Sequence, residues 1–285
     1  MTALLQAVLD DMERVGVAPS DPRKIAFDTP NVVRFHVRGD KPGTLNGYAR
    51  LFSDGVPAGV FGSWKLGAQH VWCAKRQDQL SADDLAAVRA RIEAAQRERE
   101  AELVLAHEKA AKMAQSRFMA IPAASPNHGY LSRKKIQPFT ARQDGSLLVL
   151  ALQDFDGEIR SLQTIAPNGR KKLMTGGAKK GFHIPVSDQG HGRLLICEGF
   201  ATGASLAEMF PDDGVIASVD AGNLPPVAQA ARAKFPDREI IIAADNDATG
   251  LRFANRAARA IGALLMVPST PGADWNDEFT KGVRP

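Results

Sequence analysis

Two short apolar runs in the last third of the sequence end abruptly in acidic residues. Residues 194–197 are followed by Glu198, and residues 240–244 are followed by Asp245 and Asp247. Continuous apolar runs are typical of strands buried on both faces of a parallel sheet, and open α/β sheets bind ligands at the carboxyl ends of such strands. Carboxylates gathered at that edge repel each other unless a cation is bound, and Mg²⁺ prefers carboxylate oxygens. The pattern therefore indicates metal-dependent phosphate chemistry; the alternative is an ordinary α/β protein whose strand-end acids only aid solubility.

The elements that must position these acids alternate along the chain. The sequence predicts helices over residues 201–210 and 226–235 and strands over residues 215–219 and 263–268. A basic helix is expected after Asp247, and the last strand leads into Asp274. Alternating strands and helices of this length predict an α/β fold in which a parallel sheet is flanked by helices.

These residues, in this order, resemble the Toprim domain that bacterial primases, topoisomerases and some nucleases share. The matching segments are residues 198–199, 221–223, 245–250 and 274–277. The resemblance implies that Glu198 is a metal ligand or a general acid/base and that Asp245 and Asp247 hold Mg²⁺ or Mn²⁺. It also implies that Asp274 is a further metal ligand.

The segment upstream of the acidic region is basic. Residues 130–180 contain ten Lys and Arg against four acids, a net charge of +6, whereas the chain from residue 193 onward has a net charge of −3. A basic lobe next to an acidic one fits a polyanion held by the first and a metal held by the second, although a solvated hairpin face is the alternative. The candidate DNA-binding or nucleotide-binding residues are Arg133, Lys134, Lys135, Arg170, Lys171, Lys172, Lys179 and Lys180.

Two hairpin signals organise this basic segment. Asp156-Gly157 and Asn168-Gly169 are typical of tight turns between antiparallel strands, and the flanking residues 145–152 and 158–165 read as strands. The segment resembles the N-terminal part of the primase RNA polymerase domain, especially in primases of conjugative plasmids and phages. With the Toprim part, the resemblance covers roughly residues 125–285.

The first part of the chain has no recognisable catalytic motif. Residues 1–78 are predicted to contain a helix and several short strands. Trp64 and Trp72 lie there among Arg and Lys residues, so they are candidates for stacking on template bases. The alternative is that both tryptophans are core residues. Ser81 and Asp84 form a capping pattern that opens a helix to about residue 117. We therefore expect an N-terminal α+β domain (1–78), a helical connector (79–120), a basic α+β subdomain (121–190) and the Toprim domain (191–285).

Composition excludes several classes of protein. No apolar run is long enough to cross a membrane, and the first residues lack a signal-peptide pattern, so no membrane contact and a cytoplasmic location are expected. The two cysteines, Cys73 and Cys197, form no disulfide framework. His70-x-x-Cys73 is at most half of a zinc site, so zinc is not expected. Residues 176–181 lack the spacing of a phosphate-binding loop, so a helicase would be a separate protein.

The resulting hypothesis is a nucleotidyltransferase of the DNA-directed RNA polymerase type, a primase. It would join NTPs into short RNA primers on single-stranded DNA during plasmid or phage replication or conjugation, with Mg²⁺ or Mn²⁺ as cofactor. A separate replicative helicase or replication initiator is a candidate partner. The alternatives are a Toprim-type metal-dependent nuclease and a non-catalytic accessory protein that binds single-stranded DNA.

Overall fold

The computed structural model describes residues 2–75, 80–187 and 192–282. The chain divides into two compact units, Met1–Val104 and Leu105–Pro285. Two of the expected domain boundaries, at 78/79 and 190/191, lie outside the described residues. No helix in the described part of the chain is both long enough and apolar enough to cross a membrane.

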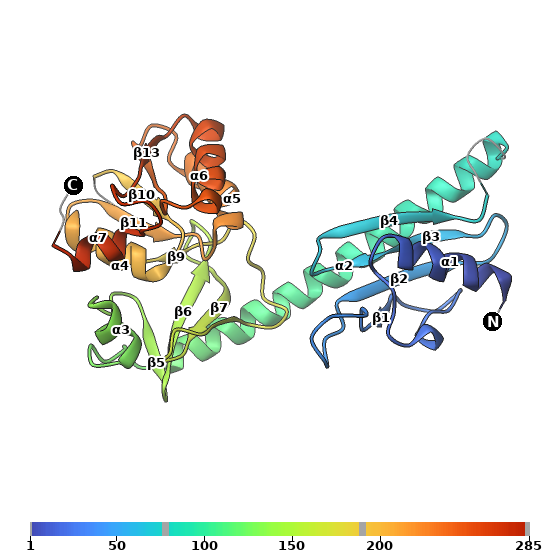
Figure 1. The fold of residues 1–285 in the computed structure, drawn as a ribbon, viewed down its shortest axis with the longest axis horizontal. Helices are drawn as coiled ribbons and strands as arrows, with labels where there is room; N and C mark the ends of the chain where they lie inside the picture. The colour runs from blue at the N-terminus through green and yellow to red at the C-terminus, as the bar shows by residue number, and fades with distance from the viewer. Residues whose placement is uncertain (1, 76–79, 188–191, 283–285) are drawn as a thin grey trace. The chain divides into compact units, whose positions relative to one another are not determined.

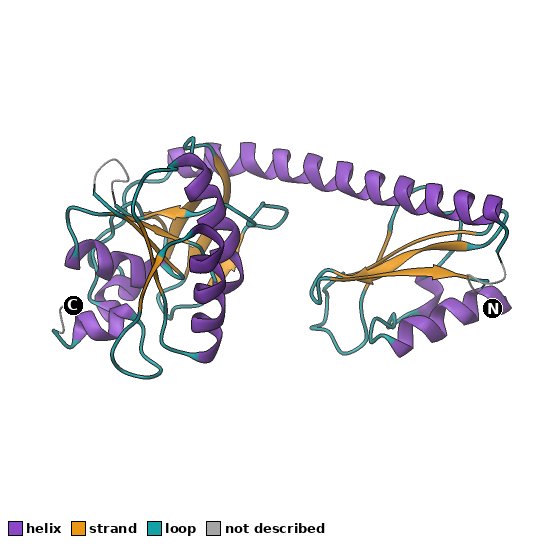
Figure 2. Ribbon diagram, turned by 90° about the horizontal axis from the view of Figure 1, so that it is seen from above, coloured by secondary structure: helices purple, strands orange, loops and turns teal. Residues whose placement is uncertain are grey.

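The first unit is built around a four-stranded antiparallel sheet. The strands are β1 (Val33–Phe35), β2 (Gly47–Phe52), β3 (Ala58–Ser63) and β4 (Ala68–Cys73), in the order β1-β2-β3-β4. Helix α1 (Ala3–Arg14) packs on one face through Val8 and Met12, and a 3₁₀ turn, Pro22–Lys24, follows it. Val88 packs on the other face, so the sheet of this unit lies between two helices (Figure 2).

Val88 belongs to a single long helix, α2 (Ala82–Ala120). Its start follows the expected capping pattern, because the Asp84 N–H donates to Ser81 Oγ and the Ser81 N–H donates to Asp84 Oδ2. The helix ends three residues beyond the expected position. The division between the two compact units falls inside this helix, between Val104 and Leu105.

The second unit contains two sheets. The first is an antiparallel sheet with the strand order β5-β6-β7-β8. Its strands are β5 (Arg142–Asp144), β6 (Leu147–Gln153), β7 (Ile159–Ile165) and β8 (Lys171–Leu173). A short helix, α3 (Gly129–Lys134), precedes the sheet in the chain. Both predicted tight turns are present, with Gly157 and Gly169 at positive φ of 89° and 87°. Along β6, Leu150 faces the main core, whereas Val149 and Ala151 pack with Ala114 of α2.

The second sheet has the order β13-β12-β10-β11-β9. Its strands are β9 (Ile184–Pro185), β10 (Leu194–Cys197), β11 (Gly214–Ala217), β12 (Ile240–Ala243) and β13 (Leu264–Met266), and all pair in parallel except β9. Helices α4 (Phe200–Met209) and α7 (Trp275–Thr280) lie on one side, and α5 (Leu224–Lys234) and α6 (Ala248–Ile261) on the other (Figure 1). The predicted α/β fold with a parallel sheet flanked by helices is confirmed.

Two local predictions about this sheet differ from the structure, and one strand was not expected. The strand expected to reach Val219 ends at Ala217, because the chain turns into a 3₁₀ helix, Ala221–Asn223. The helix expected from Pro226 begins at Leu224, since proline is tolerated in the first helical turn. The antiparallel edge strand β9 was not predicted.

Candidate metal and nucleotide site

The two apolar runs bring their acids to one edge of the sheet. Strands β10 and β12 are parallel neighbours, with Cys197 opposite Ala243. Glu198 follows β10 directly, and Asp245 follows β12 after one further residue. The register therefore places both carboxyl groups at the carboxyl end of the sheet, as the sequence predicted.

Asp247 and Asp274 reach the same edge as N-caps of helices. Asp247 Oδ1 accepts hydrogen bonds from the N–H groups of Thr249 and Gly250, both at 2.8 Å, and opens α6. Asp274 opens α7 in a capping box with Asp277. Both acids are therefore held by helix N-termini, whose partial positive charge favours a carboxylate.

Backbone hydrogen bonds tie the Asp274 loop to the Asp245 loop. The Asn246 N–H donates to the Ala273 carbonyl at 2.9 Å, and the Gly272 N–H donates to the Asn246 carbonyl at 2.7 Å. The loop after β13, which lies far from Asp245 along the chain, is thereby fixed beside it.

The electrostatics of the site centre on Asp245. Burial, together with the charges of Glu198, Asp274 and Asp247, raises the pKa of Asp245 to about 7. Burial also raises the pKa of Glu198, and the negative charge of Asp247 raises it further. Asp245 Oδ1 is buried and has no hydrogen-bond partner in the described part of the chain. The site therefore contains more negative charge than its own donors balance.

These residues fit a hard divalent cation in their chemistry. All the donors are carboxylate oxygens, which Mg²⁺ and Mn²⁺ prefer, and the unpaired Asp245 Oδ1 is a buried oxygen in need of a positive partner. Among the described residues, no three His, Cys, Asp or Glu side chains are placed closely enough to ligate one ion together. The observations that favour a metal are therefore the unpaired oxygen and the mutual repulsion of the carboxylates.

Three of the predicted basic residues face acids of the Toprim part. The charge of Lys171 lowers the pKa of both Glu198 and Asp245, in opposition to burial. Lys134 Nζ lies 3.8 Å from Asp274 Oδ2, and Lys179 Nζ lies 2.6 Å from an oxygen of Asp220. Cations from the basic segment thus surround the acidic edge of the sheet.

The remaining basic candidates have other positions. The Arg133 guanidinium donates to the Pro167 carbonyl and lies over the ring of Tyr130. Lys135 is the C-cap of α3 with a left-handed backbone. Arg170 and Lys180 are exposed. The structure gives Arg133 and Lys135 local structural roles and leaves the side chains of Arg170 and Lys180 open to solvent.

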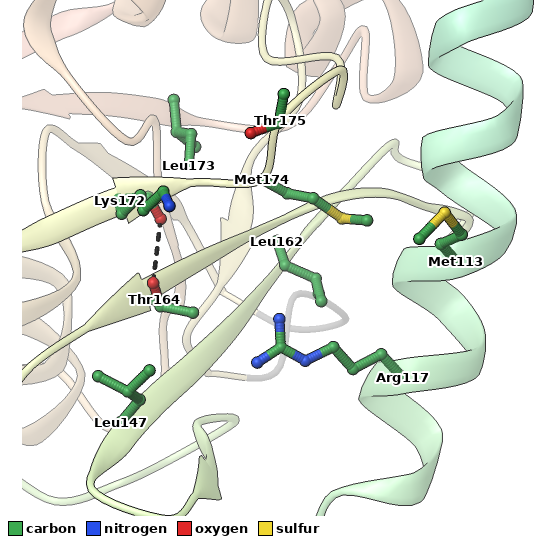
Figure 3. A pocket seen from close by; sticks show the side chains of 9 residues that line it. All are labelled: Met113, Arg117, Leu147, Leu162, Thr164, Lys172, Leu173, Met174 and Thr175. Carbon is green, nitrogen blue, oxygen red and sulfur yellow. Dashed lines mark hydrogen bonds between the residues drawn. The ribbon is translucent and has the colours of Figure 1, made fainter. Parts of the chain in front are cut away.

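Lys172 lies on the opposite face of its strand from Lys171. Side chains alternate along β8, so Leu173 packs toward the main core while Met174 packs with the cluster against α2. Lys172 lines a hollow with Met113 of α2, away from Glu198 (Figure 3). The sequence predicted one binding group for both lysines, but their side chains lie on opposite faces of β8.

The two tryptophan candidates also differ. The ring of Trp64 is half-buried, with the Arg34 guanidinium 4.9 Å above its centre and the ring of Tyr48 at 5.1 Å. Trp72 is only 4% exposed and packs edge-on against Phe27 in the core of the first unit. Trp64 is therefore partly exposed to solvent, whereas Trp72 is enclosed in the core.

Sequence reasoning gave no role to Asn223, which turns out to connect the two parts of the second unit. Its amide donates to the carbonyls of Phe182 and Ser218, both at 2.9 Å, and its Oδ1 accepts from the Gly181 N–H at 2.9 Å. These bonds hold the loop that carries Lys179 against the strand end. The Ala-Gly-Asn match was the only sequence signal for this contact.

Val219 is a second feature that sequence reasoning missed. It has a φ of 79°, which is uncommon for a β-branched residue and strains the backbone beside Asp220. Strained residues of this kind cluster at functional sites, so the position of Val219 agrees with the placement of the site. No residue type in the sequence marks this strain.

Comparison with known proteins defines the class. Residues 193–283 match the Toprim domain family, so this part of the chain is a Toprim domain. Over 258 residues the chain is 30% identical to DNA primase TraC of Escherichia coli, covering 82% of this chain and 24% of that protein. A second DNA primase TraC of Escherichia coli is 32% identical over 256 residues, covering 82% of this chain and 17% of the relative. The resemblance to Toprim-domain primases is confirmed, and the chain spans a quarter or less of these relatives.

Two solved structures are also similar. The primase fragment of the bacteriophage T7 primase-helicase protein has a TM-score of 0.44 and 17% identity, and the match covers 57% of this chain and 75% of that chain. The DnaG primase catalytic domain bound to ssDNA has a TM-score of 0.47 and 12% identity, covering 62% and 78%.

Proposed function

We propose that this protein is a DNA primase that joins NTPs into short RNA primers on single-stranded DNA. The observation that carries the proposal is the buried, unpaired carboxylate oxygen of Asp245 in a Toprim domain, where the charges of Glu198, Asp247 and Asp274 act on it. The 30% identity to DNA primases over most of the chain supports this activity over others that use the same domain.

In this proposal, Asp245, Asp247, Asp274 and Glu198 hold Mg²⁺ or Mn²⁺. The ion, when bound, neutralises phosphate charge and makes the attacking 3′-hydroxyl easier to deprotonate. Glu198 is suited to accept that proton, because burial raises its pKa above the usual glutamate value and makes it a stronger base. A triphosphate at this edge would meet Lys171, which faces Glu198.

The other cations have supporting roles in this proposal. Lys134 and Lys179 are paired with Asp274 and Asp220, and a phosphate that displaces these carboxylates would find two positioned ammonium groups. Exposed Arg170 and Lys180 would contact the template backbone. We further propose a cytoplasmic protein of plasmid or phage replication or conjugation, with a separate helicase or replication initiator as partner and with no zinc.

Primer synthesis with labelled NTPs on single-stranded DNA tests the proposal. We expect short RNA products that require Mg²⁺ or Mn²⁺ and that Asp245→Asn abolishes. Asp237→Asn is the matched control, because Asp237 is an exposed acid of the same domain. Metal-dependent cleavage of the template without synthesis would favour the Toprim-type nuclease. Binding of single-stranded DNA without either reaction would favour a non-catalytic accessory protein.

A further inference from the structure

A hollow of about 400 Å³ lies on the α2 face of the β5–β8 sheet. It opens between the last part of α2 and strands β7 and β8 (Figure 3). The proposed primase reaction uses none of its side chains, because the carboxylate site lies at the carboxyl end of the other sheet.

The base of the hollow is apolar and adaptable. Leu162 is only 1% exposed and belongs to the cluster that packs under α2, with Met174 packed against it. Met113 of α2 is 56% exposed beside them. Figure 3 shows the thioethers of Met113 and Met174 pointing toward each other across the opening. Methionine side chains are flexible and polarisable, so they adapt to apolar side chains of different shape.

Two cations, Lys172 and Arg117, line the hollow. Lys172 lies on one side, where the Thr164 hydroxyl donates to its carbonyl at 3.3 Å. Arg117 enters from α2 and pairs with Asp144 at 2.8 Å. Because both partners of that pair are roughly half exposed, the pair contributes only about 0–1 kcal/mol, and an incoming carboxylate competes for the guanidinium at little cost.

We propose that this hollow binds a partner protein through a short segment that places an apolar side chain next to carboxylates. The apolar side chain of the segment packs against the apolar base of the hollow. Its carboxylates bind Lys172 and Arg117, whose positive charges complement them. Nucleic acid fits less well, because none of the described residues that line the hollow is aromatic and able to stack on a base, and a phosphate would leave the apolar base unfilled.

A labelled peptide of alternating Asp and Leu, titrated with the full chain and followed by fluorescence anisotropy, tests the inference. We expect Lys172→Glu and Met113→Glu each to weaken peptide binding by about tenfold or more, since both put a carboxylate at the hollow. Lys112→Glu makes the same charge change on an exposed position of α2 that does not line the hollow, and we expect it to change the affinity by less than about twofold.

Two further peptides separate the contributions. A peptide of Asp and Ser lacks the apolar groups, and one of Lys and Leu lacks the acids, so both should bind much more weakly than the Asp-Leu peptide. Equal losses in Lys172→Glu and Lys112→Glu, or no preference for the Asp-Leu peptide, would overturn the inference. Competition by oligo-dT that Met113→Glu abolishes would also overturn it and assign the face to nucleic acid.

These outcomes do not depend on the proposed primase reaction. The readout is peptide binding, and we expect Met113→Glu to make primers at the wild-type rate. Thermal unfolding shows that each variant is folded. If primer synthesis proves absent from the wild type while the peptide binds as expected, only the proposed function fails.

Discussion

Replacing Asp245 with Asn should stabilise the metal-free protein at and above neutral pH. The pKa of Asp245 is raised to about 7 in the folded state, whereas an unfolded aspartate ionises near 3.8. Below about pH 4 Asp245 is protonated in both the folded and the unfolded state, so it does not change the free energy of unfolding. Between about pH 4 and 7 the unfolded state releases this proton while the folded state retains it, so stability falls across this range and the full loss is reached above about pH 7, where Asp245 is ionised beside other acids. Asn has nearly the same shape and carries no charge, so the variant avoids this loss.

The size of the effect follows from the shift. About three pH units at 1.36 kcal/mol each give an upper limit of about 4 kcal/mol. Asp245 is half-buried rather than fully enclosed, so water and salt screen part of the repulsion. We therefore expect Asp245→Asn to raise the free energy of unfolding by about 2 kcal/mol near pH 8 and by almost nothing near pH 4.

Urea unfolding of both proteins in EDTA across this pH range measures the difference directly. Asp213→Asn is a control of opposite sign. Burial alone would raise the pKa of Asp213, but its hydrogen bonds with Arg193 lower that pKa overall. Asp213→Asn should therefore be less stable than the wild type at neutral pH, and the deficit should shrink in acid.

The effect of Mg²⁺ on thermal stability tests the same site by ligand binding. A ligand that binds only the folded state stabilises it, so Mg²⁺ should raise the melting temperature of the wild type more than that of Asp245→Asn. Asp245 would not carry this ionisation penalty if Asp245→Asn were no more stable than the wild type near pH 8 in EDTA. A gain that stayed constant from pH 8 to pH 4 would likewise show that ionisation of Asp245 is not its cause.

Three further predictions concern other residues. Lys171→Ala should reduce the log–log salt slope of DNA or nucleotide binding by about 0.7–0.9, while Lys172→Ala should leave it unchanged; equal slopes would contradict the assignment of the two lysines to opposite faces. Trp64→Ala should weaken binding of single-stranded template by about 1–3 kcal/mol and impair initiation on bare template, whereas unimpaired binding and initiation would make the Trp64 cluster structural. Burial lowers the pKa of His183 to about 4, so the wild type should lose up to about 3 kcal/mol between pH 6.5 and 4, and His183→Gln should remove this dependence in urea unfolding.

The C-terminal sheet and the acids at its edge can be predicted from the amino-acid sequence alone. Four-residue apolar runs such as 194–197 and 240–243 have no polar face, so they are stable only as strands covered on both sides. Parallel strands then bring the residues that follow them, Glu198 and Asp245, to the same edge. The two hairpin turns could also be predicted from the sequence, because Gly157 and Gly169 allow the positive φ that these turns require.

Tertiary structure alone decided which side chains share a surface. Lys171 and Lys172 are adjacent in the sequence, but only the packing of β8 between α2 and the Toprim part shows which lysine faces the acids. Trp64 and Trp72 have similar neighbours in sequence, yet Trp72 lies in the core. The bonds of Asn223 to residues some forty positions away follow no local pattern. Local sequence determines backbone conformation through sterics and periodicity, whereas these contacts depend on chain segments that meet only after folding.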